Sequence, residues 1–384
     1  MRDHQYKLIN FADGSQEFYD LLADPLETNN LNNDLTADQI TVKEALMVEA
    51  IQIRTGWSCN DLILNGEEMT IDDCSSTPPV NECDHDNSTN YTNIGCCETQ
   101  QFPSAYYEKV ENDTRTIYSN GYPNHDFCFN VNRIPEPKYA IYDVAANPTK
   151  AASPTSVVDD NGRPGLFFGV AVNGVLMAPA PATPFIFENP NTGEYNWDWV
   201  FEPTNNQGEG QALVALDCAS AHTGPQGYHY HGNMFEYVEK IQPGIAATTT
   251  PPDAPLHIGW AADGFPILYR FGPDANGNLA LLQPSYQFKM GERPGDGITA
   301  PCGPYNGKYT NDYEYVASSG DLDECNGVDR TITLTTATGE ETFSHFYIIT
   351  DSFPQIPRCV VGTPGNGFTN NNNLMVTDLS LIHI

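Results

Sequence analysis

The stretch "GLFFGVAVNGVLM" (Gly165–Met177) decides the fold class. Two short apolar runs, 166–172 and 175–177, stand on either side of Asn173–Gly174, a dipeptide typical of tight hairpin turns. Runs this short are strands rather than helices when Gly and Asn bound them. We therefore expect two adjacent antiparallel strands here.

The same pattern of short apolar runs between Gly, Pro and Asn turns is found from about Thr116 onward. Examples are "WDWVF" (Trp197–Phe201), "TITLTT" (Thr331–Thr336) and "FSHFYIIT" (Phe343–Thr350). We find no long amphipathic helical pattern after residue 116. This part of the chain is predicted to be mainly β, an antiparallel β-sandwich or a barrel-like fold with long loops.

The first residues have a different pattern. "QYKLINF" (Gln5–Phe11) and "EFYDL" (Glu17–Leu21) are expected to be strands joined by a turn. A helix is predicted from Thr36, where Thr36 and Gln39 form a capping box, and Gly56 would end it. The β body is thus preceded by a small α+β fragment.

Composition excludes several classes of partner. The chain has 17 Lys and Arg against 50 Asp and Glu, a formal net charge of −33. A field of this sign repels nucleic acids and anionic membranes. No apolar run reaches the length of a membrane span. We expect neither nucleic-acid binding nor a membrane-spanning segment.

The 10 cysteines form no C-x-x-C pair, which disfavours a thiolate zinc site. Their even number in sequence rich in Gly, Asn and Pro favours disulfides and an oxidising compartment. Residues 1–30 contain no signal peptide. We therefore expect a secreted, periplasmic or cell-surface protein whose N-terminus is truncated.

Two disulfides are predicted. Strands at 331–336 and 343–350 are expected to pair as a hairpin, which would bring Cys325 and Cys359 together. In the Cys-rich segment, Cys59 and Cys74 are the expected pair.

Histidines and tyrosines alternate in "GYHYHGNMF" (Gly227–Phe235). Because successive side chains of a strand point to opposite faces, His229 and His231 would share one face, and Tyr228 and Tyr230 the other. Two imidazoles at this spacing can bind one ion. The alternative is a solvent-facing polar strand with no ligand.

The clustering of histidines favours a metal site. Four of the 9 histidines fall between positions 222 and 257. Imidazoles with carboxylates suit zinc, copper, manganese or iron better than calcium or magnesium, and Zn²⁺ or Cu²⁺ is the expected cofactor. For Asp263, which precedes a Gly turn, capping of that turn is the alternative role. The candidate metal ligands are His222, His229, His231, His257, Asp217, Asp263 and His125.

Several ordered motifs resemble the YHYH domain family over about residues 115–362. They include "SNGYPNHDF" (Ser119–Phe127), "LDCASAHTGPQGYHYHGN" (Leu216–Asn233), "IGWAADGFPILYRFG" (Ile258–Gly272) and "FPQIPRC" (Phe353–Cys359). The resemblance implies a secreted or surface protein and names no activity. Where family members often carry a Y-x-Y strand, this chain has "HFYIIT" (His345–Thr350), so roles of that strand's aromatic residues do not carry over.

Two further resemblances concern the N-terminal part. "YKLI", "EFYDL" and "DPLETNNL" (within Tyr6–Leu31) resemble the C-terminal end of a type I sulfatase. The nucleophile motif of that family is absent, so this chain alone is not a sulfatase, and a sulfatase domain is expected upstream. "CNDLILNGEEMTIDDCSSTPPVNEC" (Cys59–Cys83) resembles a short Cys-rich module of secreted bacterial proteins.

The expected organisation has four parts: 1–55, sulfatase-like; 56–112, Cys-rich module and linker; 113–365, YHYH domain; and 366–384, a tail. Three functions stay open: metal binding without catalysis, a metal- or His-dependent hydrolase or oxidoreductase, and a non-catalytic structural or interaction module. The absence of a G-x-S-x-G motif disfavours acyl transfer.

Overall fold

The computed structural model describes residues 102–127, 135–186, 195–204 and 216–370, together with short pieces between residues 6 and 43. The chain divides into two compact units, Met1–Glu82 with Gly208–Gly210, and Cys83–Gln207 with Gln211–Ile384. The expected Cys59–Cys74 bond and the tail after residue 370 lie outside the described residues. Within the described part, no helix is both long enough and apolar enough to cross a membrane.

The first unit contains the two strands that the sequence predicts. β1 (Tyr6–Asn10) and β2 (Gln16–Asp20) pair as an antiparallel hairpin. The capping box is also confirmed: the Thr36 backbone N donates to Gln39 Oε1 at 3.0 Å, and the Gln39 backbone N donates to Thr36 Oγ1 at 3.3 Å. The end of that helix lies outside the described residues.

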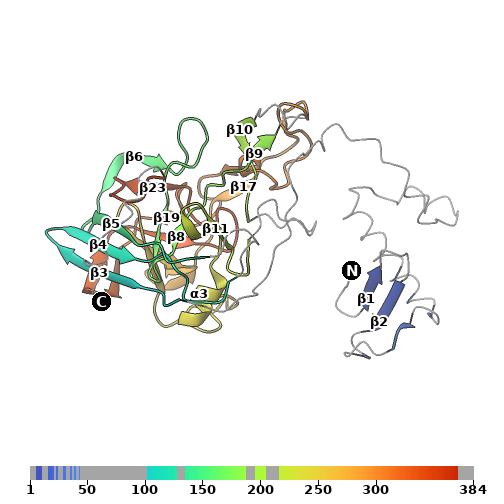
Figure 1. Ribbon diagram of the computed structural model, residues 1–384, viewed down its shortest axis with the longest axis horizontal. Coiled ribbons are helices and arrows are strands. Elements are labelled where there is room, and N and C mark those ends of the chain that lie inside the picture. Colours follow the sequence, from blue (N-terminus) through green and yellow to red (C-terminus); the bar gives the residue numbers. More distant parts are fainter. Residues whose placement is uncertain are drawn as a thin grey trace. The chain divides into compact units, whose positions relative to one another are not determined.

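An eight-stranded mixed sheet forms the centre of the second unit (Figure 1). The pairs β12–β8 and β14–β22 are parallel, and the other neighbours are antiparallel. In spatial order the strands are β11 (Ala221–Gly224), β12 (Gly227–Tyr230), β8 (Leu176–Met177), β7 (Gly169–Ala171), β13 (His257–Ala261), β14 (Pro266–Tyr269), β22 (Phe346–Ile349) and β19 (Gly327–Val328).

Smaller sheets and hairpins surround the central sheet. The described helices of this unit are α3 (Phe235–Ile241) and a short 3₁₀ turn (Thr310–Asp312). The remaining strands are β3 (Tyr106–Glu111), β4 (Thr114–Ser119) and β5 (Ala140–Ala145) in one sheet, and the pairs β6 (Lys150–Ser156) with β23 (Cys359–Gly362), β9 (Pro184–Ile186) with β10 (Tyr195–Val200), β15 (Phe271–Pro273) with β16 (Leu279–Leu281), β17 (Tyr286–Phe288) with β18 (Tyr313–Tyr315), and β20 (Ile332–Thr336) with β21 (Gly339–Phe343).

The core lies on both faces of the central sheet. Every residue of β7, β14 and β22 is buried, which explains their unbroken apolar sequences. The three-stranded sheet β3–β4–β5 packs against this core, and Trp260 of β13 donates its indole N–H to Glu108 of β3 at 2.6 Å. A mainly β, sandwich-like fold with long loops is therefore confirmed.

The hairpin at Asn173–Gly174 is confirmed as well. β7 and β8 pair antiparallel, with Gly169 opposite Met177. Gly174 has a φ of 86°, and a Cβ there would lie 2.2 Å from Ser119 Oγ. Glycine is thus required at this position for two reasons, the left-handed backbone of the turn and the close approach of β4.

The predicted hairpin between 331–336 and 343–350 is wrong. β20 pairs with β21 (Gly339–Phe343), and β22, apolar on both faces, joins the central sheet between β14 and β19. The Cys325–Cys359 disulfide is nevertheless confirmed. Tyr347 holds together the two segments that carry these cysteines. Its backbone pairs with Gly327, and its hydroxyl accepts the Val361 backbone N–H at 2.6 Å.

Loss of this disulfide is expected to destabilise the protein by about 4 kcal/mol. The bond closes a loop with a sequence separation of 34, for which the chain-entropy model gives this value. The measurement is urea unfolding of a Cys325→Ala, Cys359→Ala double variant against the oxidised wild type. A difference below about 1 kcal/mol would show that the bond restricts the unfolded chain much less than this model requires.

Candidate metal centre

Three histidines project from one hairpin. β11 and β12 are joined by a tight turn, and their register places His222 directly opposite His229. His231 follows β12 on the same face as His229, and its backbone N donates to Ser220 O at 2.8 Å. His229 and His231 are buried, and His222 is partly buried.

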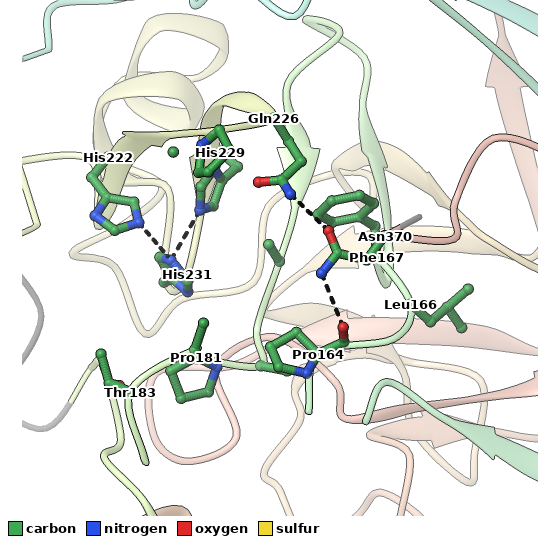
Figure 2. A pocket seen from close by; sticks show the side chains of 15 residues that line it. Pro164, Leu166, Phe167, Pro181, Thr183, His222, Gln226, His229, His231 and Asn370 are labelled. Carbon is green, nitrogen blue, oxygen red and sulfur yellow. Dashed lines mark hydrogen bonds between the residues drawn. The ribbon is translucent and has the colours of Figure 1, made fainter. Parts of the chain in front are cut away.

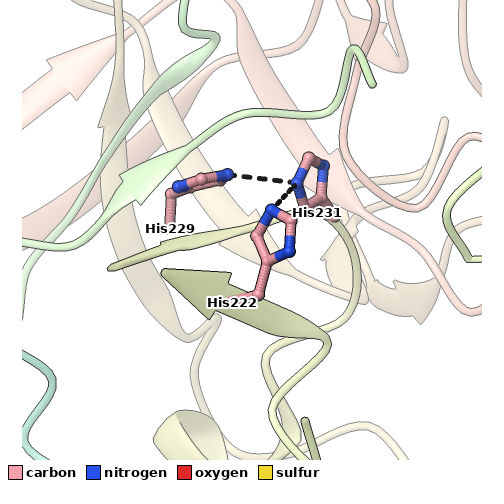
Figure 3. A group of neighbouring side chains, drawn as sticks. All are labelled: His222, His229 and His231. Atoms are coloured by element: carbon pink, nitrogen blue, oxygen red, sulfur yellow. Dashed lines mark hydrogen bonds between the residues drawn. The ribbon is translucent and has the colours of Figure 1, made fainter. Parts of the chain in front are cut away.

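The ring nitrogens of these residues point toward one another (Figure 3). His231 Nε2 lies 3.1 Å from His229 Nε2 and 3.1 Å from His222 Nε2, and the three ligand atoms all lie within 4.8 Å of one another. A tetrahedral ion with metal–nitrogen distances of about 2.0–2.1 Å separates its ligand atoms by roughly 3.3 Å. The spacing therefore suits one bound ion. We call these three residues the triad.

The tautomer of His229 suits a ligand. Its Nδ1 lies 2.9 Å from the carbonyl oxygen of Gly227, which can only accept, so Nδ1 carries the proton. In the neutral ring Nε2 then presents its lone pair to the triad. Burial, with a smaller effect of His222, lowers the pKa of His229 to about 3, and burial lowers the pKa of His231 as well. Both rings are thus neutral near pH 7, as metal binding requires.

The three rings cannot all be joined by hydrogen bonds to one another. Because His229 Nε2 can only accept, His231 Nε2 would have to donate, and one N–H cannot make a linear bond to both neighbouring rings. A single cation, in contrast, accepts all three lone pairs. The donor set therefore fits a transition metal ion.

A cavity of about 300 Å³ adjoins the triad (Figure 2). Its walls are mostly apolar, with polar groups from Gln226 and Asn370. Among the described residues, the group that could hold a metal contains the three histidines and no further His, Cys, Asp or Glu. An ion held by the triad would thus have a coordination position facing the cavity.

The tyrosines of the alternating stretch take part in a different network. The Tyr228 hydroxyl donates to Asp217 Oδ2 at 2.6 Å, and the Tyr230 hydroxyl contacts His125 Nε2 at 2.6 Å. Asn173, from the β7–β8 turn, donates to the Tyr230 hydroxyl at 2.8 Å. The histidine and tyrosine side chains thus separate to opposite faces, as the alternation predicts.

Asp217 and His125 belong to this network and lie outside the triad. Asp217 Oδ1 accepts the backbone N–H groups of Ala219 and Ala221, at 2.9 and 3.2 Å. Asp217 therefore caps the turn that leads into β11 and holds it against Tyr228. Asp217 therefore helps to position the hairpin that carries the triad, and it does not join the triad itself.

His257 and Asp263, the other two candidate ligands, also lie elsewhere. His257 Nε2 donates to Gly259 O at 2.9 Å, its ring packs on Trp260, and it lines a separate cavity. Asp263 accepts the Tyr347 hydroxyl at 2.6 Å and the Gly362 N–H at 2.7 Å, besides capping its own turn at Phe265. Of the seven candidate ligands, the structure brings three together, His222, His229 and His231.

Three residues around the triad were not singled out from the sequence. A Cβ at Gly224 would lie 2.7 Å from His229 Cε1, so only glycine leaves room for that ring. Gln226 and Asn370 supply the amides of the cavity. Gly224 and Gln226 could have been found from the sequence, because they lie in and next to the tight turn that precedes β12. Nothing in the sequence indicates that Asn370 lies near this hairpin.

The buried His125 is expected to make stability fall in mild acid. Burial lowers its pKa to about 4, from 6.5. Between these values the unfolded chain binds more protons, so the stability present above pH 6.5 is lost as the pH falls toward 4. From pH 7 to pH 5 this one group should cost roughly 2 kcal/mol.

The measurement is urea unfolding of the wild type and of a His125→Gln variant at both pH values. The variant should lose roughly 2 kcal/mol less than the wild type between pH 7 and pH 5. Equal losses would place the acid sensitivity in other groups.

A sequence model of the family described as YHYH protein matches residues 141–362, more than half of the chain, and the chain therefore belongs to that family. No curated protein matches the chain. No solved structure matches it either.

Proposed function

We propose that this YHYH protein binds one divalent transition metal ion, Zn²⁺ or Cu²⁺, through the Nε2 atoms of His222, His229 and His231. The supporting observation is the convergence of these three nitrogens, with two separations of 3.1 Å. Neutral imidazoles favour zinc and copper over calcium and magnesium.

The test is metal analysis of purified protein, followed by titration of the metal-free protein against a competing chromogenic chelator. One equivalent of zinc or copper should bind, and calcium and magnesium should not displace it. A protein that takes up no transition metal under these conditions would leave only a structural or interaction role for the hairpin.

Gly224→Ala is expected to weaken metal binding about 10- to 100-fold, the range seen when groups that orient a ligand are changed. The added methyl group would occupy the space of the His229 ring, at 2.7 Å from Cε1, and displace it. Chelator competition measures the effect. Thr223→Val, at the preceding position of the same strand, is the matched control and should keep wild-type affinity. Equal affinities of the two variants would contradict this role of Gly224.

A metal-dependent enzyme is the second candidate, favoured by the cavity beside the triad. Three protein ligands with one open position are the pattern of catalytic zinc sites, where the ion lowers the pKa of a bound water. Exchange of small ligands at the ion would favour this alternative. A site closed to all ligands would favour binding without catalysis.

We also propose that the protein functions in an oxidising compartment, as a secreted, periplasmic or surface protein. The Cys325–Cys359 disulfide supports this, because such bonds are rare in the reducing cytosol. Fractionation of the native cells tests it, and protein confined to the cytosol would refute it. A sulfatase domain upstream of Met1 stays a prediction from the resemblance alone, to be checked by sequencing upstream.

A further inference from the structure

Gln226 has a fixed orientation at the cavity. Asn370 Nδ2 donates to Pro164 O at 2.9 Å, and the Asn370 backbone N donates to Gly165 O at 3.1 Å. With its amide nitrogen committed to a carbonyl, Asn370 presents its Oδ1 to Gln226, whose Nε2 donates to it at 2.8 Å. The carbonyl oxygen of Gln226 must then point the other way.

That oxygen points toward the triad. A Cβ built on Gly224 would lie 3.6 Å from Gln226 Oε1 and 2.7 Å from His229 Cε1, so the oxygen lies beside the imidazole. Figure 2 shows the oxygen on the side of His229 and the nitrogen on the side of Asn370. A hydrogen-bond acceptor is thus held on the side of the cavity where His229 lies.

The other side chains that line the cavity carry no formal charge. Among the described residues that line this cavity, none is Asp, Glu, Lys or Arg. Leu166, Phe167 and Pro181 offer apolar surface instead. A ligand group that donates a hydrogen bond is matched to the Gln226 oxygen, whereas a carboxylate would place a second acceptor against it.

We infer that the coordination position beside the triad receives a neutral carboxamide ligand, whose oxygen binds the ion and whose N–H donates to Gln226 Oε1. A carboxamide is a small neutral group with a metal-binding oxygen directly beside an N–H. An apolar substituent of one ring fits a cavity of about 300 Å³ and packs on Phe167. The inference rests on the proposed metal binding and adds the class of ligand.

The experiment uses the protein loaded with Co²⁺, whose visible absorption reports a change of ligand. Three probes of similar shape are titrated: benzamide, N,N-dimethylbenzamide, which lacks the N–H, and benzoate, which is anionic and also lacks it. Benzamide should bind several-fold to about tenfold more tightly than the dimethyl compound, the value of one hydrogen bond. Benzoate, which the charge of the ion attracts, should gain affinity in Gln226→Leu, because this change removes the opposing Gln226 oxygen.

Gln226→Leu should bind Co²⁺ as tightly as the wild type and lose the preference for benzamide over the dimethyl compound. Thr183→Val, which changes another residue of the cavity wall, is the matched control and should keep that preference. Because the inference is read from the ratio of two probes, a general weakening in either variant does not affect it.

The outcomes separate the two proposals. Failure to bind Co²⁺, Zn²⁺ or Cu²⁺ overturns the proposed function and the inference together. Metal binding without a spectral response to benzamide overturns the inference alone. A benzoate affinity that is unchanged in Gln226→Leu, or a preference for benzamide over the dimethyl compound that persists there, also refutes the role of Gln226 and leaves metal binding standing.

Discussion

Replacement of both His229 and His231 by alanine is expected to abolish stoichiometric metal binding. Each change removes one of three ligand nitrogens, and even changes of groups that only orient a ligand cost 10- to 100-fold in affinity. The combined loss should therefore exceed about 100-fold and reach the limit of chelator competition. Elemental analysis of the purified variant should find no bound zinc or copper.

The control is His257→Ala, which removes a partly buried histidine of the same domain that lies at a separate cavity. It should keep one equivalent of metal. Thermal unfolding of the metal-free proteins checks that the double variant is folded. A folded double variant that still binds one equivalent would place the metal elsewhere in the chain.

Arg115→Met is expected to destabilise the protein by about 3–5 kcal/mol, the cost of removing one partner of a buried ion pair. The Arg115 side chain is 0% exposed and donates to Glu108 at 3.0 Å and to Glu341 at 2.7 Å. Its guanidinium also lies 3.6 Å from the centre of the Trp260 ring. Without it, the Glu108 carboxylate, 1% exposed, would lose its cation.

Urea unfolding measures this loss, and Lys109→Met is the matched control. Lys109 pairs with Glu111 on the same strand, with both side chains exposed, and such a pair contributes less than about 1 kcal/mol. A second variant, Arg115→Met with Glu108→Gln, should recover part of the loss because the fully buried carboxylate is neutralised and only Glu341, 20% exposed, stays charged without Arg115. Equal effects of Arg115→Met and Lys109→Met would contradict the structural role assigned to this ion pair.

Features with a local cause were predicted from the sequence. The Asn173–Gly174 turn, the Thr36–Gln39 capping box and the separation of histidines from tyrosines each depend on residues close together in the chain. A period of two fixes the face of a side chain once the residue is known to lie in a strand. The triad was therefore within reach of the sequence, because all its members lie on one hairpin.

Features that depend on distant pairing were not predicted. His257 and Asp263 were grouped with the triad because they lie close to it in the sequence. In the sheet, however, β8 and β7 lie between β12 and β13, the strand that begins at His257. Strand order is a property of the whole sheet, and spacing along the chain does not determine it. The same limit applies to Asn370, whose contact with Gln226 spans 144 residues.

The pairing error at 331–350 has a similar physical origin. β20 and β22 are both apolar enough to be strands, and the sequence analysis joined them directly. The segment between them, β21 (Gly339–Phe343), carries Glu340 and Glu341 and was read as a connection. In the structure Glu341 forms an ion pair with Arg115 of β4. A buried cation thus stabilises this acidic strand, and the local sequence does not reveal it.

The position of the triad within a single hairpin has a consequence for the unfolded chain. All three ligands lie between residues 222 and 231, so closing a chelate ring around an ion requires only a short loop and little entropy. The denatured protein should therefore keep part of its affinity for the metal. Binding to both states reduces the stabilisation that mass action would otherwise provide. The ion should thus raise the melting temperature less than its affinity for the native protein implies, and the nascent hairpin can acquire it before residue 370 has been synthesised.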